Sequence, residues 1–166
     1  KNNSASFLNG CKAMIAKREG IWFYGLSGSG KTFASGVVSG VVESGFIIDG
    51  DEVRSLISVD LGYEMKDRVI QLNRVLGIAQ LAKNNSRFPI VSTVTMTADI
   101  LQRCYALDID VVQIVRPFEM LTKVRSLYDA EVNVVGKHIN LEDLKTPVID
   151  NDGGRAFEKK VTKYVE

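Results

Sequence analysis

The chain has 166 residues and a mass of 18.3 kDa, which is the usual size of one domain built around a single core. Hydrophobic residues make up 45% of it and charged residues 25%, so a disordered or collagen-like chain is excluded. The 21 basic and 20 acidic residues leave a net charge of +1, which gives no electrostatic case for binding nucleic acid. Because no apolar run is long enough to cross a bilayer, we expect one domain, residues 1–166, with neither a nucleic-acid nor a membrane partner.

The N-terminal residues and the cysteines bear on where the protein works. The first residues show no apolar segment followed by a small-residue cleavage site, as a secretory signal would. Cys11 and Cys104 lie far apart in the sequence and form no metal-binding motif. Both features favour a reduced, cytoplasmic setting.

Short apolar runs alternate with longer segments of helical period along the chain. Residues 1–19 are predicted to form a helical extension that precedes the fold, with its apolar residues on one face. The predicted strands are 21–24, 46–48, 90–94, 111–115 and 148–149, and the predicted helices are 31–42, 65–83, 99–107, 117–130 and a last one after residue 154. Continuous apolar strands that alternate with helices are typical of a parallel sheet covered on both faces, so we predict an α/β doubly wound fold. Ligands of such sheets bind at the carboxyl ends of the strands.

The segment that follows the first predicted strand, Gly25 to Thr32, matches the G-x-x-x-x-G-K-[ST] pattern of a phosphate-binding P-loop. Its glycines let backbone N–H groups point inward at a phosphate, and the helix that follows adds the positive end of its dipole. Lys31 is suited to the β- and γ-phosphates, and the Thr32 hydroxyl to Mg²⁺. The predicted nucleotide-binding residues are Gly25, Ser27, Gly28, Ser29, Gly30, Lys31 and Thr32. The motif indicates ATP or GTP, and no Asn-Lys-x-Asp stretch that would read guanine is present.

A second polar cluster, Asp49 to Arg54, follows the second predicted strand and reads Asp-Gly-Asp-Glu-Val-Arg. A carboxylate at that strand end is suited to hold Mg²⁺ through water or to accept a proton from an attacking hydroxyl. The alternative is an Asp-Gly turn in which Asp51 caps the next helix. Arg54 and Arg68 are suited to clamp an anion, although each arginine taken alone also fits a solvated helix face.

Together these segments resemble the adenylylsulfate (APS) kinase family of P-loop kinases. The resemblance runs in order from about Ile21 to Leu81, and weaker similarity continues through Val91–Thr95 and Arg125–Tyr128. The segments that carry it are Gly25–Thr32, Asp49–Arg54, Asp60-Leu61-Gly62-Tyr63 and Asp67-Arg68. It implies a P-loop nucleoside triphosphate hydrolase or kinase fold. It also implies Mg²⁺-dependent transfer of the γ-phosphoryl group of ATP to the ribose 3′-hydroxyl of adenylylsulfate.

Several roles follow from the resemblance. Asp49 would be a metal-linked acid or base near the 3′-hydroxyl, Tyr63 would lie against the acceptor base, and Arg125 would close over the phosphates as part of a lid. The implied catalytic residues are Lys31, Asp49 and Arg54, and the implied metal ligands are Thr32 and Asp49. The implied acceptor-binding residues are Asp49, Arg54, Tyr63, Arg68, Gln71, Thr95 and Val134.

The chain departs from the family mainly on the acceptor side. Gln71 stands where the family has asparagine, Thr95 where it has serine, and Val134 where it has a second base-stacking phenylalanine. The loss of one stacking partner, worth about 1–3 kcal/mol per base, weakens the argument for adenine, and a smaller pyrimidine would suit a slot between Tyr63 and Val134. The chain therefore also resembles capsule-pathway relatives that phosphorylate the 3′-hydroxyl of cytidine diphosphoramidate.

A noncatalytic nucleotide-binding regulator is the remaining alternative. The presence of both Asp49 and Arg54 argues against it, because a binding protein needs neither. The expected partner is a small nucleotide acceptor. A homodimer is compatible with the sequence, and nothing in the sequence decides the oligomeric state.

Overall fold

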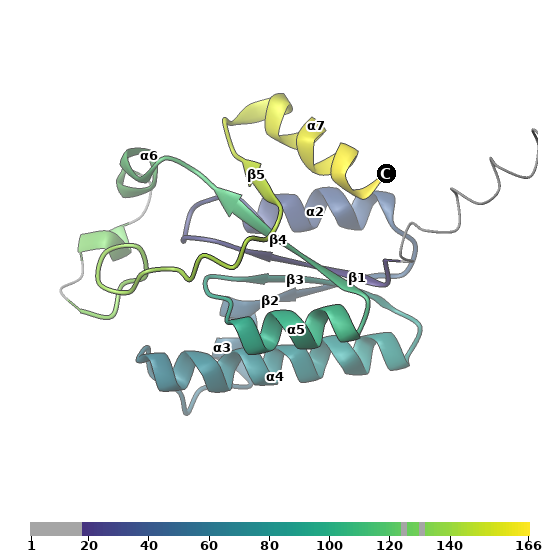
Figure 1. Cartoon of the computed structure of the whole chain (residues 1–166), viewed down its shortest axis with the longest axis horizontal. Coiled ribbons are helices and arrows are strands. Elements are labelled where there is room, and N and C mark those ends of the chain that lie inside the picture. The colour runs from purple at the N-terminus through teal and green to yellow at the C-terminus, as the bar shows by residue number, and fades with distance from the viewer. Residues whose placement is uncertain (1–17, 124–125, 130–131) are drawn as a thin grey trace, which may run out of the picture.

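Five parallel strands form one sheet, in the order β2-β3-β1-β4-β5, in the computed structural model of the protein (Figure 1). The structure describes residues 18–123, 126–129 and 132–166, so residues 1–17 of the predicted helical extension, and Arg125, lie outside the described residues. The strands are β1 (Gly20–Tyr24), β2 (Gly45–Asp49), β3 (Phe88–Thr93), β4 (Ile109–Val115) and β5 (Val148–Asp150). The helices are α2 (Lys31–Val41), α3 (Gly50–Leu56), α4 (Met65–Asn84), α5 (Ala98–Ala106), α6 (Phe118–Thr122) and α7 (Gly154–Val165), with a 3₁₀-helix η2 (Ser126–Asp129).

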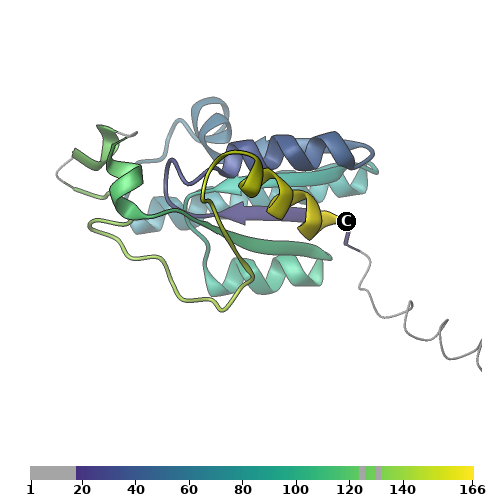
Figure 2. The ribbon, with the colours of Figure 1, turned by 90° about the horizontal axis from the view of Figure 1, so that it is seen from above.

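Helices cover both faces of the sheet, as Figures 1 and 2 show. Side chains of β1 alternate between two cores because successive residues of a strand point to opposite faces. Ile21 and Phe23 pack with residues of α2 and α7, whereas Trp22 and Tyr24 pack with residues of α4 and α5. This arrangement confirms the predicted α/β doubly wound fold. Within the described parts of the chain, no helix combines the length and apolar character that a membrane span requires.

The order of the strands indicates where on the sheet a ligand would bind. From β1 in the middle, the chain first builds β2 and β3 on one side and then β4 and β5 on the other. In such sheets ligands bind outside the carboxyl ends of the strands, at the point where the direction of winding changes. The P-loop follows β1 and Asp49 ends β2, so both lie at this edge.

The structure corrects three local predictions. Helix α3 begins at Gly50 and its N-cap is Asp49, whose side chain accepts a hydrogen bond from the Asp51 N–H group; the alternative in which Asp51 caps the helix is therefore wrong. The helix predicted over 117–130 is shorter, because α6 ends at Thr122 and a separate 3₁₀-helix follows.

The apolar face predicted for α4 is also partly wrong. The sequence predicts a broad apolar face on this helix, formed by Val69, Leu72, Leu76, Ile78, Ala79 and Leu81, but Val69 and Leu81 are 40% and 63% exposed. Gln71 and Val75 are buried instead, together with Leu72 and neighbouring apolar residues of α4. The buried face of α4 therefore includes one polar side chain, Gln71, near the start of the helix.

Candidate active site

The P-loop connects β1 to α2 as its motif requires, and two of its glycines occupy positions that no other residue fits. A Cβ atom on Gly25 would lie 2.2 Å from the backbone carbonyl oxygen of Ile114. Gly30, the N-cap of α2, has a φ of +107°, and a Cβ atom there would lie 2.4 Å from the side-chain amide nitrogen of Asn151. The loop is therefore packed directly against the carboxyl ends of β4 and β5.

Lys31 begins α2 and folds back over the loop. Its side chain is buried, and its Nζ donates a hydrogen bond to the Leu26 carbonyl oxygen at 2.9 Å. The N–H group of Ser29 donates to the same carbonyl oxygen at 3.1 Å, which closes a turn at the tip of the loop. The cation is thus held beside the N-terminus of α2, where the helix dipole also favours an anion.

Asp49 lies at the junction of β2 and α3, next to Thr32, the other predicted metal ligand. Its Oδ1 accepts from the Asp51 N–H group at 2.8 Å, while its Oδ2 accepts from the Thr32 hydroxyl at 3.3 Å and from the Ser92 hydroxyl at 3.2 Å. Ser92 pairs with Asp49 in the β2–β3 register, so its position next to the carboxylate follows from the sheet. Sequence reasoning missed Ser92, because the register of β3 against β2 was not known.

The Thr32–Asp49 pair fits Mg²⁺. Both donors are oxygen atoms, which this hard cation prefers, and Mg²⁺ usually takes only one or two protein ligands together with water and substrate phosphates. Within residues 18–123, 126–129 and 132–166, no three His, Cys, Asp or Glu side chains cluster closely enough to form a fuller metal cage. The pair and a nucleotide phosphate would therefore share the ion.

Two predicted acceptor-binding cations pack against the ring of Tyr63. The guanidinium carbon of Arg54 lies 4.7 Å from the ring centroid and that of Arg68 lies 5.7 Å from it, within the range of cation–π contacts. Arg54 donates to the Gly62 carbonyl oxygen at 2.7 Å, and Arg68 donates to the Tyr63 carbonyl oxygen at 2.9 Å. Burial lowers the pKa of Arg68, and the nearby charge of Arg54 lowers it further. The structure thus groups the three residues, as the sequence predicted.

The other predicted acceptor residues are more buried. Gln71 donates from Nε2 to the Gly50 carbonyl oxygen at 3.0 Å, while its buried Oε1 has no hydrogen-bond partner among the described residues. Thr95 is buried in the segment that follows β3. Val134 is 6% exposed and packs in a small apolar cluster with Leu121 and Tyr128. Its place in a base slot opposite Tyr63 stays a prediction.

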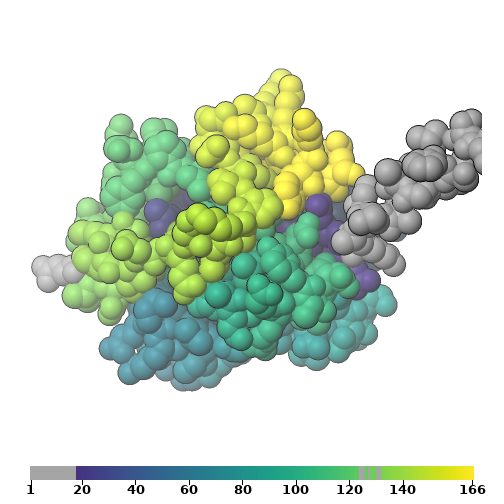
Figure 3. Space-filling view, in the orientation of Figure 1, coloured from purple at the N-terminus to yellow at the C-terminus, as the bar shows by residue number. Residues whose placement is uncertain are grey.

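Three side chains that sequence reasoning did not assign contact the P-loop from outside: Arg116, Tyr128 and Asn151. Arg116 comes directly after β4 and Asn151 directly after β5, and a position at the carboxyl end of a strand was the signal available for both. Tyr128 lies in η2, and no pattern in the sequence predicted that η2 packs against the P-loop. Figure 3 shows a small purple patch, from the early part of the described chain, between the green and yellow-green segments.

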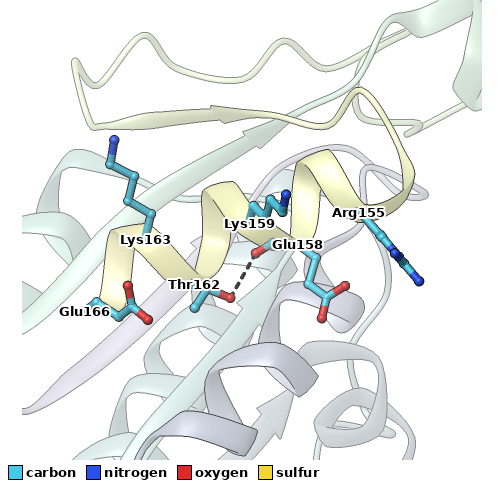
Figure 4. A pocket seen from close by; sticks show the side chains of 6 residues that line it. All are labelled: Arg155, Glu158, Lys159, Thr162, Lys163 and Glu166. Atoms are coloured by element: carbon cyan, nitrogen blue, oxygen red, sulfur yellow. Dashed lines mark hydrogen bonds between the residues drawn. The ribbon is translucent and has the colours of Figure 1, made fainter.

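An exposed hollow along α7 is separate from these residues. Figure 4 shows the six side chains that line it: Arg155, Glu158, Lys159, Thr162, Lys163 and Glu166. Both signs of charge are present, and the Thr162 hydroxyl donates to the Glu158 carbonyl oxygen of its own helix. None of the predicted site residues lines this hollow.

Comparison with known proteins agrees with the geometry. Residues 17–130 match the family model described as adenylylsulphate kinase. The adenylyl-sulfate kinase of Clostridium acetobutylicum is 39% identical over 74 residues, which are 42% of this chain and 37% of that protein. The bifunctional enzyme CysN/CysC of Mycobacterium tuberculosis is 34% identical over 83 residues, which are 48% of this chain and 14% of that protein. The matches thus span well under half the length of these curated relatives.

A solved structure shows the same fold. The Mycobacterium tuberculosis APS kinase CysC in complex with AMPPNP and APS aligns with a TM-score of 0.77 and 23% identity, over 89% of this chain and 95% of that one. The family model covers the chain from before β1 to just after η2, which is more than half of its residues, and confirms the resemblance that the motifs predicted. The chain therefore belongs to the adenylylsulfate kinase family.

Proposed function

We propose that the chain is an ATP-dependent kinase that transfers the γ-phosphoryl group to the ribose 3′-hydroxyl of a nucleotide with an anionic 5′ substituent, with adenylylsulfate as the acceptor. The observation that carries the proposal is the position of Asp49, whose Oδ2 lies 3.3 Å from the Thr32 hydroxyl of the P-loop. The same residue caps α3, the helix that presents Arg54. One carboxylate therefore stands between a phosphate-donor site and a cationic acceptor site.

The donor side would bind MgATP. The P-loop N–H groups and Lys31 would hold the β- and γ-phosphates, and Thr32 and Asp49 would hold Mg²⁺. When bound, Mg²⁺ supplies positive charge that offsets the charge developing on the phosphoryl oxygens. Arg125, which lies outside the described residues, would add a cation from the lid.

The acceptor side would bind a nucleotide that carries an anion on its 5′ end. Arg54 and Arg68 present guanidinium groups, which grip sulfate or phosphate bidentately, and Tyr63 offers an aromatic surface to a base. The Oε1 atom of Gln71 is buried and has no hydrogen-bond partner among the described residues, so a contact with the acceptor nucleotide would require this oxygen to become accessible.

In the transfer itself, Asp49 would accept the proton of the 3′-hydroxyl as the new O–P bond forms and the bond between the γ-phosphorus and the departing ADP oxygen breaks. Hydrogen bonds from Thr32 and Ser92 to Oδ2 and from the Asp51 N–H group to Oδ1 fix the direction of the carboxylate. A loose transition state of this kind needs positioning and cations more than covalent chemistry. We place this activity in the cytoplasm, with no nucleic-acid partner and with a homodimer as the proposed oligomer.

The test is an ADP-release assay with MgATP and, in turn, adenylylsulfate, cytidine diphosphoramidate and plain nucleoside diphosphates. We expect turnover with adenylylsulfate and a large loss of it in Arg54→Met. Arg87→Met is the matched control, because Arg87 is exposed next to the amino end of β3, at the opposite edge of the sheet. Turnover confined to cytidine diphosphoramidate would assign the other acceptor, and no acceptor-dependent ADP release would point to a noncatalytic binding protein.

A further inference from the structure

Three consecutive carbonyl groups of the P-loop each accept a hydrogen bond from a side chain outside the loop. The pairs are Tyr128 Oη to the Ser27 oxygen at 2.7 Å, Arg116 Nη1 to the Gly28 oxygen at 3.3 Å, and Asn151 Nδ2 to the Ser29 oxygen at 2.6 Å. The donors come from three separate parts of the chain: η2, the residue after β4 and the residue after β5. Contacts to successive peptide groups from independent elements restrain how those groups can rotate.

The direction of a carbonyl group determines the direction of the next N–H group. A trans peptide is planar, and its C=O and N–H bonds point to opposite sides. None of the described peptide bonds is cis. A donor that holds the Ser27 oxygen on the outside of the loop therefore turns the Gly28 N–H group inward, and one that holds the Ser29 oxygen does the same for Gly30.

The middle contact has a different consequence. The peptide whose oxygen Arg116 contacts carries the Ser29 N–H group, and this group donates to the Leu26 carbonyl oxygen at 3.1 Å. Arg116 thus supports the turn at the tip of the loop rather than an N–H group that faces a ligand. The outer two contacts act on peptides whose N–H groups are available to a phosphate.

Both outer donors are themselves held in place. Tyr128 is 4% exposed, packs with Leu121 and Val134, and meets the ring of Phe118 edge-on with centroids 5.3 Å apart. Asn151 accepts from the Gly153 N–H group at 2.9 Å through Oδ1, so its amide nitrogen faces the loop. Its backbone N–H group donates to the Val115 carbonyl oxygen at 2.7 Å. Neither donor can turn away without breaking further contacts.

We propose that Tyr128 and Asn151 are positioning residues of the phosphate site, which aim the N–H groups of Gly28 and Gly30 at the bound polyphosphate. The proposal rests on the proposed function only in that the ligand of the loop is taken to be a nucleotide polyphosphate. It adds that the affinity for phosphate depends on two side chains that touch no part of the ligand and that follow α6 and β5 in the chain.

The test uses two variants that remove a donor: Tyr128→Phe changes no charge, whereas Asn151→Asp also adds a negative charge near the loop, so the amide NMR signal of Gly30, rather than the affinity alone, tests the role of Asn151. Tyr128→Phe deletes only the hydroxyl and keeps the packing of the ring, and Asn151→Asp removes the amide donor but keeps an oxygen for the Gly153 N–H group. The matched controls are Tyr24→Phe, whose buried hydroxyl pairs with Thr146, and Asn85→Asp, whose amide donates to the Leu81 carbonyl oxygen of α4.

Two measurements separate positioning from general stability. By calorimetry with MgADP and with inorganic pyrophosphate, we expect Tyr128→Phe and Asn151→Asp each to bind about fivefold more weakly than wild type, which corresponds to the loss of one ordinary hydrogen bond. The two control variants should bind like wild type. By amide NMR, pyrophosphate should shift the Gly28 signal less in Tyr128→Phe and the Gly30 signal less in Asn151→Asp than in wild type. The melting temperatures of the four variants should not separate Tyr128→Phe and Asn151→Asp from the two controls in the way that the affinities do.

Unchanged affinity in both Tyr128→Phe and Asn151→Asp, or an equal loss of affinity in the two control variants, would overturn the inference while the proposed function stands. If wild-type protein binds neither MgADP nor pyrophosphate, the proposed function fails and the positioning role fails with it.

Discussion

Asparagine in place of Asp49 removes a negative charge and almost nothing else. The side-chain oxygen that accepts from the Asp51 N–H group at 2.8 Å remains, and asparagine is as good an N-cap as aspartate, so α3 and the fold should keep their stability. The group that faces the Thr32 and Ser92 hydroxyls changes from a proton acceptor to an amide. Loss of a general base lowers a rate by about 10²–10⁴, or roughly 3–5 kcal/mol in the barrier.

We therefore expect Asp49→Asn to lower kcat by two to four orders of magnitude and to leave ATP binding nearly intact, because Lys31 and the P-loop are untouched. Coupled ADP release with adenylylsulfate measures kcat, and calorimetry with ADP measures nucleotide binding. Asp51→Asn is the control, since Asp51 is exposed on the first turn of the same helix. Near-normal turnover in Asp49→Asn would remove this residue from the mechanism and with it the central argument for a kinase.

Three further outcomes follow from the geometry. Gly25→Ala should abolish nucleotide binding and lower the melting temperature, because the added methyl group would lie 2.2 Å from the Ile114 carbonyl oxygen; a stable variant that binds ADP would contradict this packing. Tyr63→Ala should raise the KM for the acceptor about 5- to 150-fold, as expected from lost stacking, and leave the KM for ATP unchanged, whereas Tyr63→Phe should behave like wild type. Burial raises the pKa of Cys104 to about 12, so this thiol should resist iodoacetamide at pH 9 in the native protein and react in denaturant, as peptide mass spectrometry would show; prompt native labelling would refute its burial.

The five strands and the P-loop were predictable because their signals are local. An apolar run bounded by glycine or polar residues marks each strand, and the P-loop motif fixes both the loop and the start of α2 at Lys31. The grouping of Arg54 with Arg68 was suggested by the anion-binding chemistry of their side chains and supported by the resemblance to a family; fourteen residues separate them and no local pattern joins them.

What failed depended on contacts between distant segments. The apolar residues Leu121 and Tyr128 are seven positions apart, which fits one helix, yet they pack together from two short helices. The acceptor-binding role of Gln71 stays a prediction, but its contact with the Gly50 carbonyl oxygen was not predictable, because it depends on how α4 lies against the start of α3. The role of Asn151 depends on the β4–β5 pairing, which brings it to Ser29, 122 residues earlier in the chain.

The two arginines that contact the Tyr63 ring, if they bind the anion of the acceptor as we propose, would also make the stability of the protein depend on simple anions. None of the ion pairs among the described residues includes Arg54 or Arg68, and the charge of Arg54 already disfavours the charged form of Arg68. An anion placed between them relieves this repulsion only in the folded state, since the unfolded chain holds the two charges apart. Folding and anion binding would therefore be linked, and sulfate at a hundred times its dissociation constant would add about 2.7 kcal/mol to the free energy of unfolding.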